Sequence, residues 1–220
     1  MSDEELLFLR KEDYQGKLDR LIERYAGTGR PKLLLHACCA PCSSYCLEYL
    51  LPYFDITLYY YNPNITEKAE YEHRVSEVKR LTQELGKDCG YYAGVAEGEY
   101  EPARFLEAVR GYEDQPEGGL RCVKCFRLRL SKTAEYAAKN GYGLFSTTLT
   151  ISPLKNAAVL NELGREQAEL HGTEFMPSDF KKKNGYKRSI ELSRKYGLYR
   201  QDYCGCAFSK AERERQRKEL

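Results

Sequence analysis

The sequence predicts an α/β protein in which a parallel sheet is covered by helices on both faces. Three leucines at positions 33–35, followed by His36, form a short apolar run typical of a buried strand. Pro41 suits the first turn of a helix, where its missing N–H needs no partner. Strand-like and helix-like segments then alternate along the chain, and this alternation indicates strand–helix–strand units with parallel strands.

The remaining elements follow from apolar periodicity and from the residues that interrupt it. Ser2 and Glu5 form a capping box that predicts a short first helix. We expect further helices over residues 14–25, 41–51, 66–85, 102–109, 121–140, 156–170 and 186–196. We expect further strands over 55–61, around Tyr91 and Tyr92, over 144–149 and over 174–176. Residues 27–31 break the pattern before the first strand. Gly86 is expected to end the helix over residues 66–85.

Length and composition favour one domain over residues 1–220, with N-terminal helices in residues 1–28. At 220 residues and 42% hydrophobic, the chain can bury one good core. No stretch approaches the roughly 18 apolar residues of a membrane span. The first residues are acidic and carry no targeting pattern. We therefore expect a cytoplasmic protein without a membrane partner.

The net charge of +2 hides an uneven distribution, because residues 181–220 carry +8 and residues 1–180 carry −6. A basic C-terminal segment at 181–220 fits an anionic partner such as RNA, although a solvated helical face with a frayed tail at 212–218 explains the charge equally well. If RNA binds, Tyr61 and Tyr186 are candidates for base stacking. The candidate phosphate contacts are Lys181, Lys182, Lys183 and Arg188.

Nine cysteines are many for a reducing compartment, where thiols more often serve metals or redox chemistry than structural disulfides. Cys38 and Cys39 follow the first strand and precede a helix, and ligands collect at this edge of α/β sheets. The positive end of the helix also favours a thiolate. Small cysteines can simply fill a strand end. The further thiols at Cys42 and Cys46 make that explanation less credible, and we predict a metal site.

A second pair, Cys122 and Cys125, lies at the expected start of the helix over 121–140. Alone, this spacing is ambiguous among zinc, redox and iron–sulfur roles. With Cys38 and Cys39 it gives four thiolates at one edge of the sheet, which suit tetrahedral zinc or a cubane cluster. The vicinal pair stands far before the second pair, unlike the two close knuckles of a zinc ribbon. The spacing therefore favours an iron–sulfur cluster.

The segment Cys204-Gly205-Cys206 predicts a different kind of site from the metal-ligating cysteines. In an extended chain the two cysteine Cα atoms would lie about 6.6 Å apart, near the upper limit for a disulfide. Gly205 allows a tighter fold, and a strained disulfide is easily reduced and can carry two electrons. Two further metal thiolates or a plain buried pair are the alternatives. His36 is expected to be packed rather than ligating, and Cys89 to be incidental.

Six motifs, in order along residues 14–209, resemble those of the QueH-type epoxyqueuosine reductases. They are Leu-Leu-His-Ala-Cys-Cys-Ala-Pro-Cys at 34–42, Tyr-Tyr-Asn-Pro-Asn-Ile at 60–65, Glu-Tyr-Glu-His-Arg at 70–74, Glu-Gly-Gly-Leu-Arg-Cys-Val-Lys-Cys-Phe-Arg-Leu-Arg-Leu at 117–130, Ser-Thr-Thr-Leu-Thr-Ile-Ser-Pro-Leu-Lys at 146–155 and Tyr-Arg-Gln-Asp-Tyr-Cys-Gly-Cys at 199–206. Several linked motifs in a fixed order are far more specific than any one of them.

The resemblance implies a Rossmann-like fold of the nucleotide-hydrolase type and a redox-active disulfide between Cys204 and Cys206. It implies a 4Fe–4S cluster at the carboxyl edge of the sheet, with an adjacent mononuclear iron for which Cys42 is a possible ligand. Some members carry Asp where this chain has Cys42. The implied cluster ligands are Cys38, Cys39, Cys122 and Cys125.

The resemblance also implies an oxidoreductase that acts without cobalamin. Its reaction would be the last step of queuosine biosynthesis, in which epoxyqueuosine is reduced to queuosine in tRNA. The expected partners are a tRNA that carries epoxyqueuosine in its anticodon and an unidentified electron donor. The alternative is an RNA-binding or electron-carrying protein that holds an iron–sulfur cluster or zinc and has no catalysis of its own.

Overall fold

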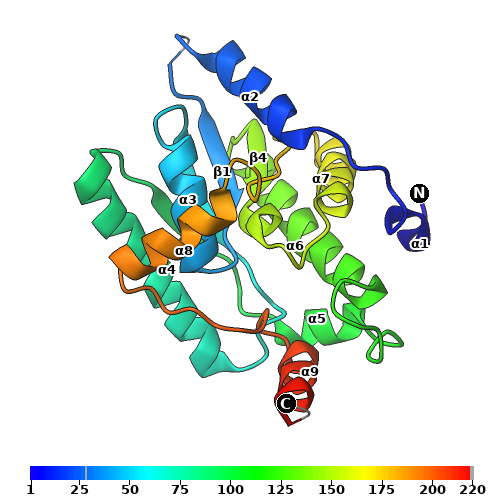
Figure 1. Cartoon of the computed structure of the whole chain (residues 1–220). Helices are drawn as coiled ribbons and strands as arrows, with labels where there is room; N and C mark the ends of the chain where they lie inside the picture. The colour runs from blue at the N-terminus through cyan, green and yellow to red at the C-terminus, as the bar shows by residue number, and fades with distance from the viewer. Residues whose placement is uncertain (28, 219–220) are drawn as a thin grey trace.

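The computed structural model describes residues 1–27 and 29–218, and in these residues it contains one sheet of five parallel strands in the order β3-β2-β1-β4-β5. The strands are β1 (Lys32–His36), β2 (Asp55–Tyr60), β3 (Gly94–Glu97), β4 (Leu144–Thr147) and β5 (Glu174–Phe175). Helices lie on both faces of the sheet (Figure 1), which confirms the predicted parallel α/β class. The expected break at 27–31 and the basic segment at 181–220 include residue 28 and residues 219–220, which lie outside the described residues.

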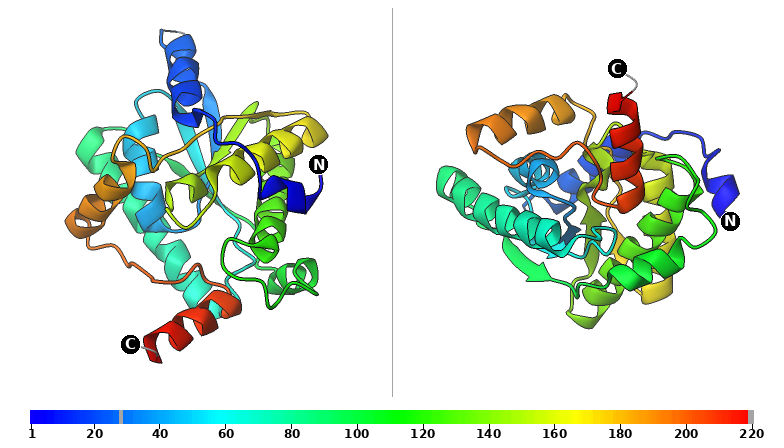
Figure 2. Two further views of the ribbon diagram at one scale, coloured as in Figure 1. Left: turned by 45° about the vertical axis from the view of Figure 1, so that its right-hand side comes forward. Right: turned by 90° about the horizontal axis from the view of Figure 1, so that it is seen from below.

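The central strand is apolar on both faces because two separate cores pack against it. Leu33 and Leu35 face the side that holds Ile56 and Leu58, whereas Leu34 faces the other side. The first core is covered by α2 (Tyr14–Tyr25), α3 (Ala40–Leu50), α4 (Lys68–Cys89) and α8 (Gly185–Lys195) (Figures 1 and 2). The second is covered by α1 (Asp3–Leu6), α6 (Leu120–Lys139) and α7 (Ala157–His171).

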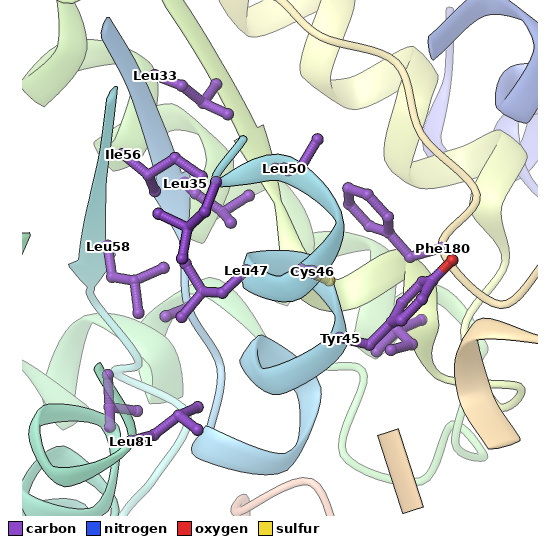
Figure 3. Packing of buried hydrophobic residues seen from close by; sticks show 14 of the residues in the cluster. Leu33, Leu35, Tyr45, Cys46, Leu47, Leu50, Ile56, Leu58, Leu81 and Phe180 are labelled. Carbon is purple, nitrogen blue, oxygen red and sulfur yellow. The ribbon is translucent and has the colours of Figure 1, made fainter. Parts of the chain in front are cut away.

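Figure 3 shows the first core, in which leucines of β1 and α3 pack together. Cys46 is fully buried here and acts as a small apolar side chain in the packing. The same helix therefore contributes Cys46 to the core and Cys42, one turn earlier, to the sheet edge.

The order of the strands places a topological switch point between β1 and β4. From β1 the chain winds through β2 to β3, and then crosses to β4 and β5 on the other side. Loops that leave β1 and β4 therefore diverge at their carboxyl ends, where α/β proteins bind ligands. The loop after β1 leads into α3, and the loop after β4 forms the short helix η1 (Thr148–Ile151).

Helix α9 (Ala207–Lys218) is a regular element, whereas the sequence left residues 212–218 open to a frayed tail. In Figure 1 it lies at the lower end of the molecule beside α5 (Pro102–Ala108). The rings of Phe105 and Phe208 lie 6.3 Å apart and join the two helices. Among the described residues, no helix combines the length and the apolar character that crossing a membrane requires.

The start of the third strand and the end of helix α4 both lie later in the chain than the sequence predicts, because Gly86 packs against Tyr92 instead of ending the helix. Tyr91 and Tyr92 precede the third strand, which starts at Gly94 and pairs with Thr57. Helix α4 continues through Gly86 and ends before Gly90, which adopts a left-handed φ of 75°. A Cβ on Gly86 would lie 2.4 Å from the Tyr92 ring, so this glycine allows close packing instead of stopping the helix.

Candidate metal and redox site

Three cysteine sulfurs meet at the carboxyl end of β1. Cys38 follows the strand, Cys39 is the extended residue that precedes α3, and Cys42 lies in the first turn of that helix. Their Sγ atoms all lie within 4.8 Å of one another, and those of Cys38 and Cys39 are 3.8 Å apart. Within residues 1–27 and 29–218 this is the one group of three or more metal-ligating side chains at such spacing. The structure thus provides a cysteine cluster that could hold a metal.

The three thiols have unequal proton affinities. The thiol of Cys39 and then that of Cys42 donate to Cys38 and lower the pKa of Cys38 well below its usual range, and the cations Arg129 and Lys155 act in the same direction. The pKa of Cys39 is raised to about 11, chiefly by its side-chain hydrogen bond with Cys38. One sulfur is therefore favoured as a thiolate, the form that binds metals.

Cys122 and Cys125 lie in the first two turns of α6 on one face of the helix. The Gly118 N–H donates to the Cys122 sulfur over 3.2 Å, and burial raises the pKa of Cys125 to about 12. Both residues line a small cavity together with Cys204 and Cys206. Their sulfurs are not part of the close group around Cys38. The predicted four ligands therefore lie in two neighbouring cavities.

A larger cavity of about 500 Å³ lies above the first cysteine group. Its lining includes Cys38, Cys39, Cys42 and Cys204. The two cavities share lining residues, namely Glu117, Arg129, Leu154, Lys155 and Cys204. Cys204 thus stands at the boundary of the two cysteine groups.

The segment Cys204-Gly205-Cys206 brings two free thiols together, with 3.5 Å between their sulfurs. Gly205 has a φ of +109°, and a Cβ here would lie 2.7 Å from a carbon of Ile65, so a glycine is required. The Cys204 carbonyl accepts hydrogen bonds from Asn64 Nδ2 at 3.2 Å and from Arg74 Nη1 at 3.3 Å. These two donors attach the dithiol segment to the turn after β2 and to α4.

Ser209, in the first turn of α9, contacts both sulfurs of this dithiol. Its hydroxyl lies 3.0 Å from the Cys204 sulfur, and its backbone N–H donates to the Cys206 sulfur over 3.3 Å. The hydrogen bond between the two sulfurs lowers the pKa of Cys204 and raises that of Cys206. A thiolate beside a thiol is the arrangement from which thiol–disulfide exchange proceeds.

Two buried or half-buried cations face the cysteines. Arg129 is 3% exposed, and its guanidinium donates to His36 and Asn62. Among the described residues it has no carboxylate within ion-pair distance, so the thiolates supply its counter-charge. Burial by itself would lower the pKa of Lys155, but the sulfurs of Cys204, Cys38 and Cys42 raise it. Lys155 is thus held as an ammonium between the two cysteine groups.

His36 is packed as expected and belongs to no metal-ligating group of the described residues. Its Nδ1 lies 2.9 Å from the Thr147 hydroxyl, and Arg129 donates to its Nε2. Full burial lowers its pKa to about 3, so the ring is neutral. It joins the ends of β1 and β4 directly beneath the cysteines.

The structure places the candidate RNA contacts away from this site. Lys181 pairs with Asp179 at 2.5 Å, Lys183 pairs with Asp19 at 2.7 Å, and Arg188 pairs with Glu48 at 2.8 Å. Lys182 is exposed. None of the four lines the cavities that the described residues form around the cysteines, and their role in RNA binding stays a prediction.

The two tyrosines proposed for base stacking differ. Tyr61 is 1% exposed and stacks on Tyr59, so its ring has no free face for a base. Tyr186 is exposed and lines the larger cavity. Cys89 is exposed and lies apart from both cavities, as expected of an incidental cysteine.

The sequence prediction missed Asn64, Arg74, Arg129, Lys155 and Ser209. One signal was available for Arg129: it lies at helical spacing from Cys125 and Thr133, on the buried face of α6. A cation in that position demands a buried anion. The others lie on loops and helices that meet only in the folded chain.

A parallel α/β fold with a cysteine cluster at its switch point and a dithiol at the adjoining cavity defines a class of thiol-rich α/β proteins equipped for redox chemistry. Within this class, the model of the epoxyqueuosine reductase QueH family matches residues 33–212, and the chain belongs to this family.

Curated relatives agree over most of the chain. The Staphylococcus epidermidis protein is 43% identical over 202 residues, which cover 90% of this chain and 85% of that protein. The Streptococcus pyogenes protein is 45% identical over 180 residues, covering 82% and 71%. The Thermotoga maritima protein is 36% identical over 194 residues, covering 86% and 95%. Each is named epoxyqueuosine reductase QueH.

Proposed function

We propose that this chain reduces epoxyqueuosine to queuosine in tRNA and so completes queuosine biosynthesis. The family and its relatives support this function and do not favour a non-catalytic RNA-binding or electron-carrying protein. One observation of the site carries the proposal: a metal-ligating cysteine group and Cys204, one of the two cysteines of a free dithiol, line the same cavity. Because cysteines supply both the metal ligands and the dithiol that would carry electrons, we propose a reaction independent of cobalamin.

The residues around the cavity fit an iron–sulfur cofactor. Two pairs of soft ligands suit a 4Fe–4S cluster. Among the described residues Arg129 pairs with no carboxylate, so its charge is available to offset the negative charge that four thiolates bring. Cys42 adds a fifth thiol beside Cys38 and fits an adjacent mononuclear iron. When bound, these groups supply one-electron transfer and a Lewis acid for an oxygen atom. The proposed cluster ligands are Cys38, Cys39, Cys122 and Cys125.

The dithiol matches the stoichiometry of the reaction. Removal of an epoxide oxygen to leave an alkene consumes two electrons and two protons and releases water. Oxidation of the Cys204 thiolate and the Cys206 thiol to a disulfide supplies two electrons and one proton, and the Lys155 ammonium supplies the second proton, so the two half-reactions balance. Lys155, held as an ammonium beside Cys204, stands ready to give a proton toward the departing oxygen. An external electron donor then reduces the disulfide for the next turnover.

The dimensions of the cavity support entry of a single nucleotide. A volume of about 500 Å³ lies in the range of small-molecule sites and cannot admit a folded RNA arm. The modified nucleotide therefore leaves the anticodon loop to reach the cysteines, as in other enzymes that act on nucleobases. Tyr186 at the lining offers a ring for base stacking.

The test is anaerobic incubation of iron-replete protein with epoxyqueuosine-containing tRNA and a chemical reductant, without cobalamin. Nucleoside mass spectrometry should detect loss of one oxygen atom from the modified base. Brown colour, iron and labile sulfide in the same protein would separate it from a colourless zinc protein. Iron-replete protein that binds this tRNA and leaves epoxyqueuosine unchanged would refute the function.

A further inference from the structure

Three arginines stand at the lining of the larger cavity and have no role in the chemistry proposed above. Arg200 precedes the dithiol segment, and Arg213 and Arg217 belong to α9. We propose that this arginine rim, defined as Arg200, Arg213 and Arg217, binds the tRNA phosphates that flank the nucleotide entering the cavity. The inference rests on the proposed function and assigns the surface that holds its substrate.

The first argument is position. Arg213 and Arg217 are four residues apart and therefore lie on one face of α9, with Gln216 beside them. All three line the cavity. The first hydrogen bond of the helix runs from the Lys210 N–H to the Cys206 carbonyl at 3.1 Å, so α9 begins directly at the dithiol. A phosphate bound at the rim therefore lies close along the chain to the dithiol.

The second argument is charge. The cavity lining contains six cationic side chains and two carboxylates, whereas the whole chain carries only +2. Arg129, Lys155 and Arg74 face inward toward the cysteines or the dithiol segment, which leaves the three rim arginines for an outside anion. A concave surface with such an excess attracts a polyanion.

The third argument is availability. Arg200 contacts the Ser193 hydroxyl at 3.1 Å and, among the described residues, pairs with no carboxylate. Arg213 Nη2 lies 3.9 Å from Glu117 Oε2. Arg217 pairs with Asp202, and the Arg217 side chain is 68% exposed. An exposed ion pair such as Arg217–Asp202 is weak, whereas guanidinium–phosphate pairs are charge-assisted and bidentate. A phosphate therefore replaces Asp202 readily, and the long Arg213–Glu117 contact leaves Arg213 able to bind a second anion.

The competing basic surface is less suited to this role. Its members Lys181, Lys182, Lys183 and Arg188 do not line the cavity. Phosphates next to an entering nucleotide must lie at the mouth of the cavity. The rim meets this condition.

The test measures binding of a fluorescein-labelled anticodon stem-loop RNA at several salt concentrations. The Arg200→Gln/Arg213→Gln/Arg217→Gln protein should bind more weakly, with a salt slope lower by about 2 units, roughly 0.7–0.9 for each lost phosphate contact. The matched control Lys182→Gln/Lys183→Gln/Arg188→Gln removes the same charge and should keep the wild-type slope. An unchanged slope in the rim variant, or an equal loss in the control, would overturn the proposal.

Two further variants guard against misfolding. Arg200→Gln, which breaks no ion pair, should lower the slope by about 0.7–0.9 units, and replacement of all three arginines by lysine should restore most of it. Iron content and thiol count should match wild type throughout. Because RNA binding is measured without turnover, the two proposals fail separately. A wild-type protein that binds RNA through the rim but does not reduce epoxyqueuosine would overturn only the function.

Discussion

The two thiol groups that share the cavity are held in place by different means. Cys38 and Cys39 follow the central strand, whose backbone pairs with β2 on one side and β4 on the other. Cys204 and Cys206 follow an extended segment and start a helix, and their position depends on two side-chain donors to one carbonyl and on one glycine.

This difference matches what each group must do. A metal ligand must stay in place, and a strand between two partners is among the least mobile parts of a fold. A dithiol must form and break a sulfur–sulfur bond, so its sulfurs have to move. The structure thus combines a fixed thiol group with an adjustable one, and each can be perturbed without the other.

The largest effect is expected from the fixed group together with the cysteine pair on α6. Replacing any one of Cys38, Cys39, Cys122 or Cys125 by Ser should abolish iron content and turnover together, because a hydroxyl is a poor substitute for a soft thiolate. Iron and sulfide assays on anaerobically purified protein measure this directly. Cys89→Ser is the matched control, since that thiol is exposed and apart from the site. Full iron content in all four variants would show that the cluster is held elsewhere.

The adjustable group should separate turnover from iron. Cys204→Ser and Cys206→Ser should each keep the wild-type iron content while multiple turnover stops, because the two-electron relay is broken. A loop of three residues restricts the unfolded chain little, so the melting temperature should barely change. Iron assay, thiol counting and turnover on the same sample distinguish a relay from a ligand. Undiminished multiple turnover in Cys204→Ser would exclude the relay.

A smaller effect is expected when the dithiol is moved rather than removed. Gly205→Ala places a Cβ against Ile65 at a φ of +109°, and such strain costs about 1–3 kcal/mol. We expect turnover to fall by about 10- to 100-fold with iron retained, because a displacement of about 1 Å in a reacting group has this cost. Gly141→Ala has a similar φ of +71° but open space around it, and it should leave turnover unchanged.

Acid should destabilise the fold through His36, which lies beside the fixed group. The pKa of His36 is about 3 in the folded protein and 6.5 as its reference value, so only the unfolded chain takes up this proton between those pH values. Stability is therefore complete above pH 6.5 and falls by up to about 1.4 kcal/mol per unit as the pH drops toward 3. Urea unfolding between pH 7 and 5 measures the slope.

A control for this slope comes from a second histidine. His36→Asn should flatten the dependence, whereas replacement of the exposed His73 by Asn should not. If the His36 variant kept the wild-type slope, the proton would have to bind elsewhere.

The sequence predicted the fixed group well because local rules determine it. An apolar run, two cysteines and Pro41 define a strand end and a helix start, and this alone brings Cys38, Cys39 and Cys42 together. Parallel strands also followed from the alternation of elements. These features need no knowledge of distant contacts.

The rest of the site depends on long-range packing that no local pattern encodes. Lys155 follows η1 and meets Cys204 only because the C-terminal segment returns to the sheet edge. Gly86 was mistaken for a stop because the partner that requires a glycine, Tyr92, reaches it after a turn of the chain. The charge distribution predicts that residues 181–220 are basic. It does not distinguish basic side chains that pair with carboxylates from basic side chains that line the cavity.

The distance along the chain between the cysteines of the cavity also sets an order of events at the ribosome. Cys42 and Cys204 line the same cavity, and at about 5–20 residues per second their synthesis is separated by on the order of ten to thirty seconds. Arg213 and Arg217 of α9 are made later still. The cavity therefore gains its complete lining only when the last helix has been synthesised.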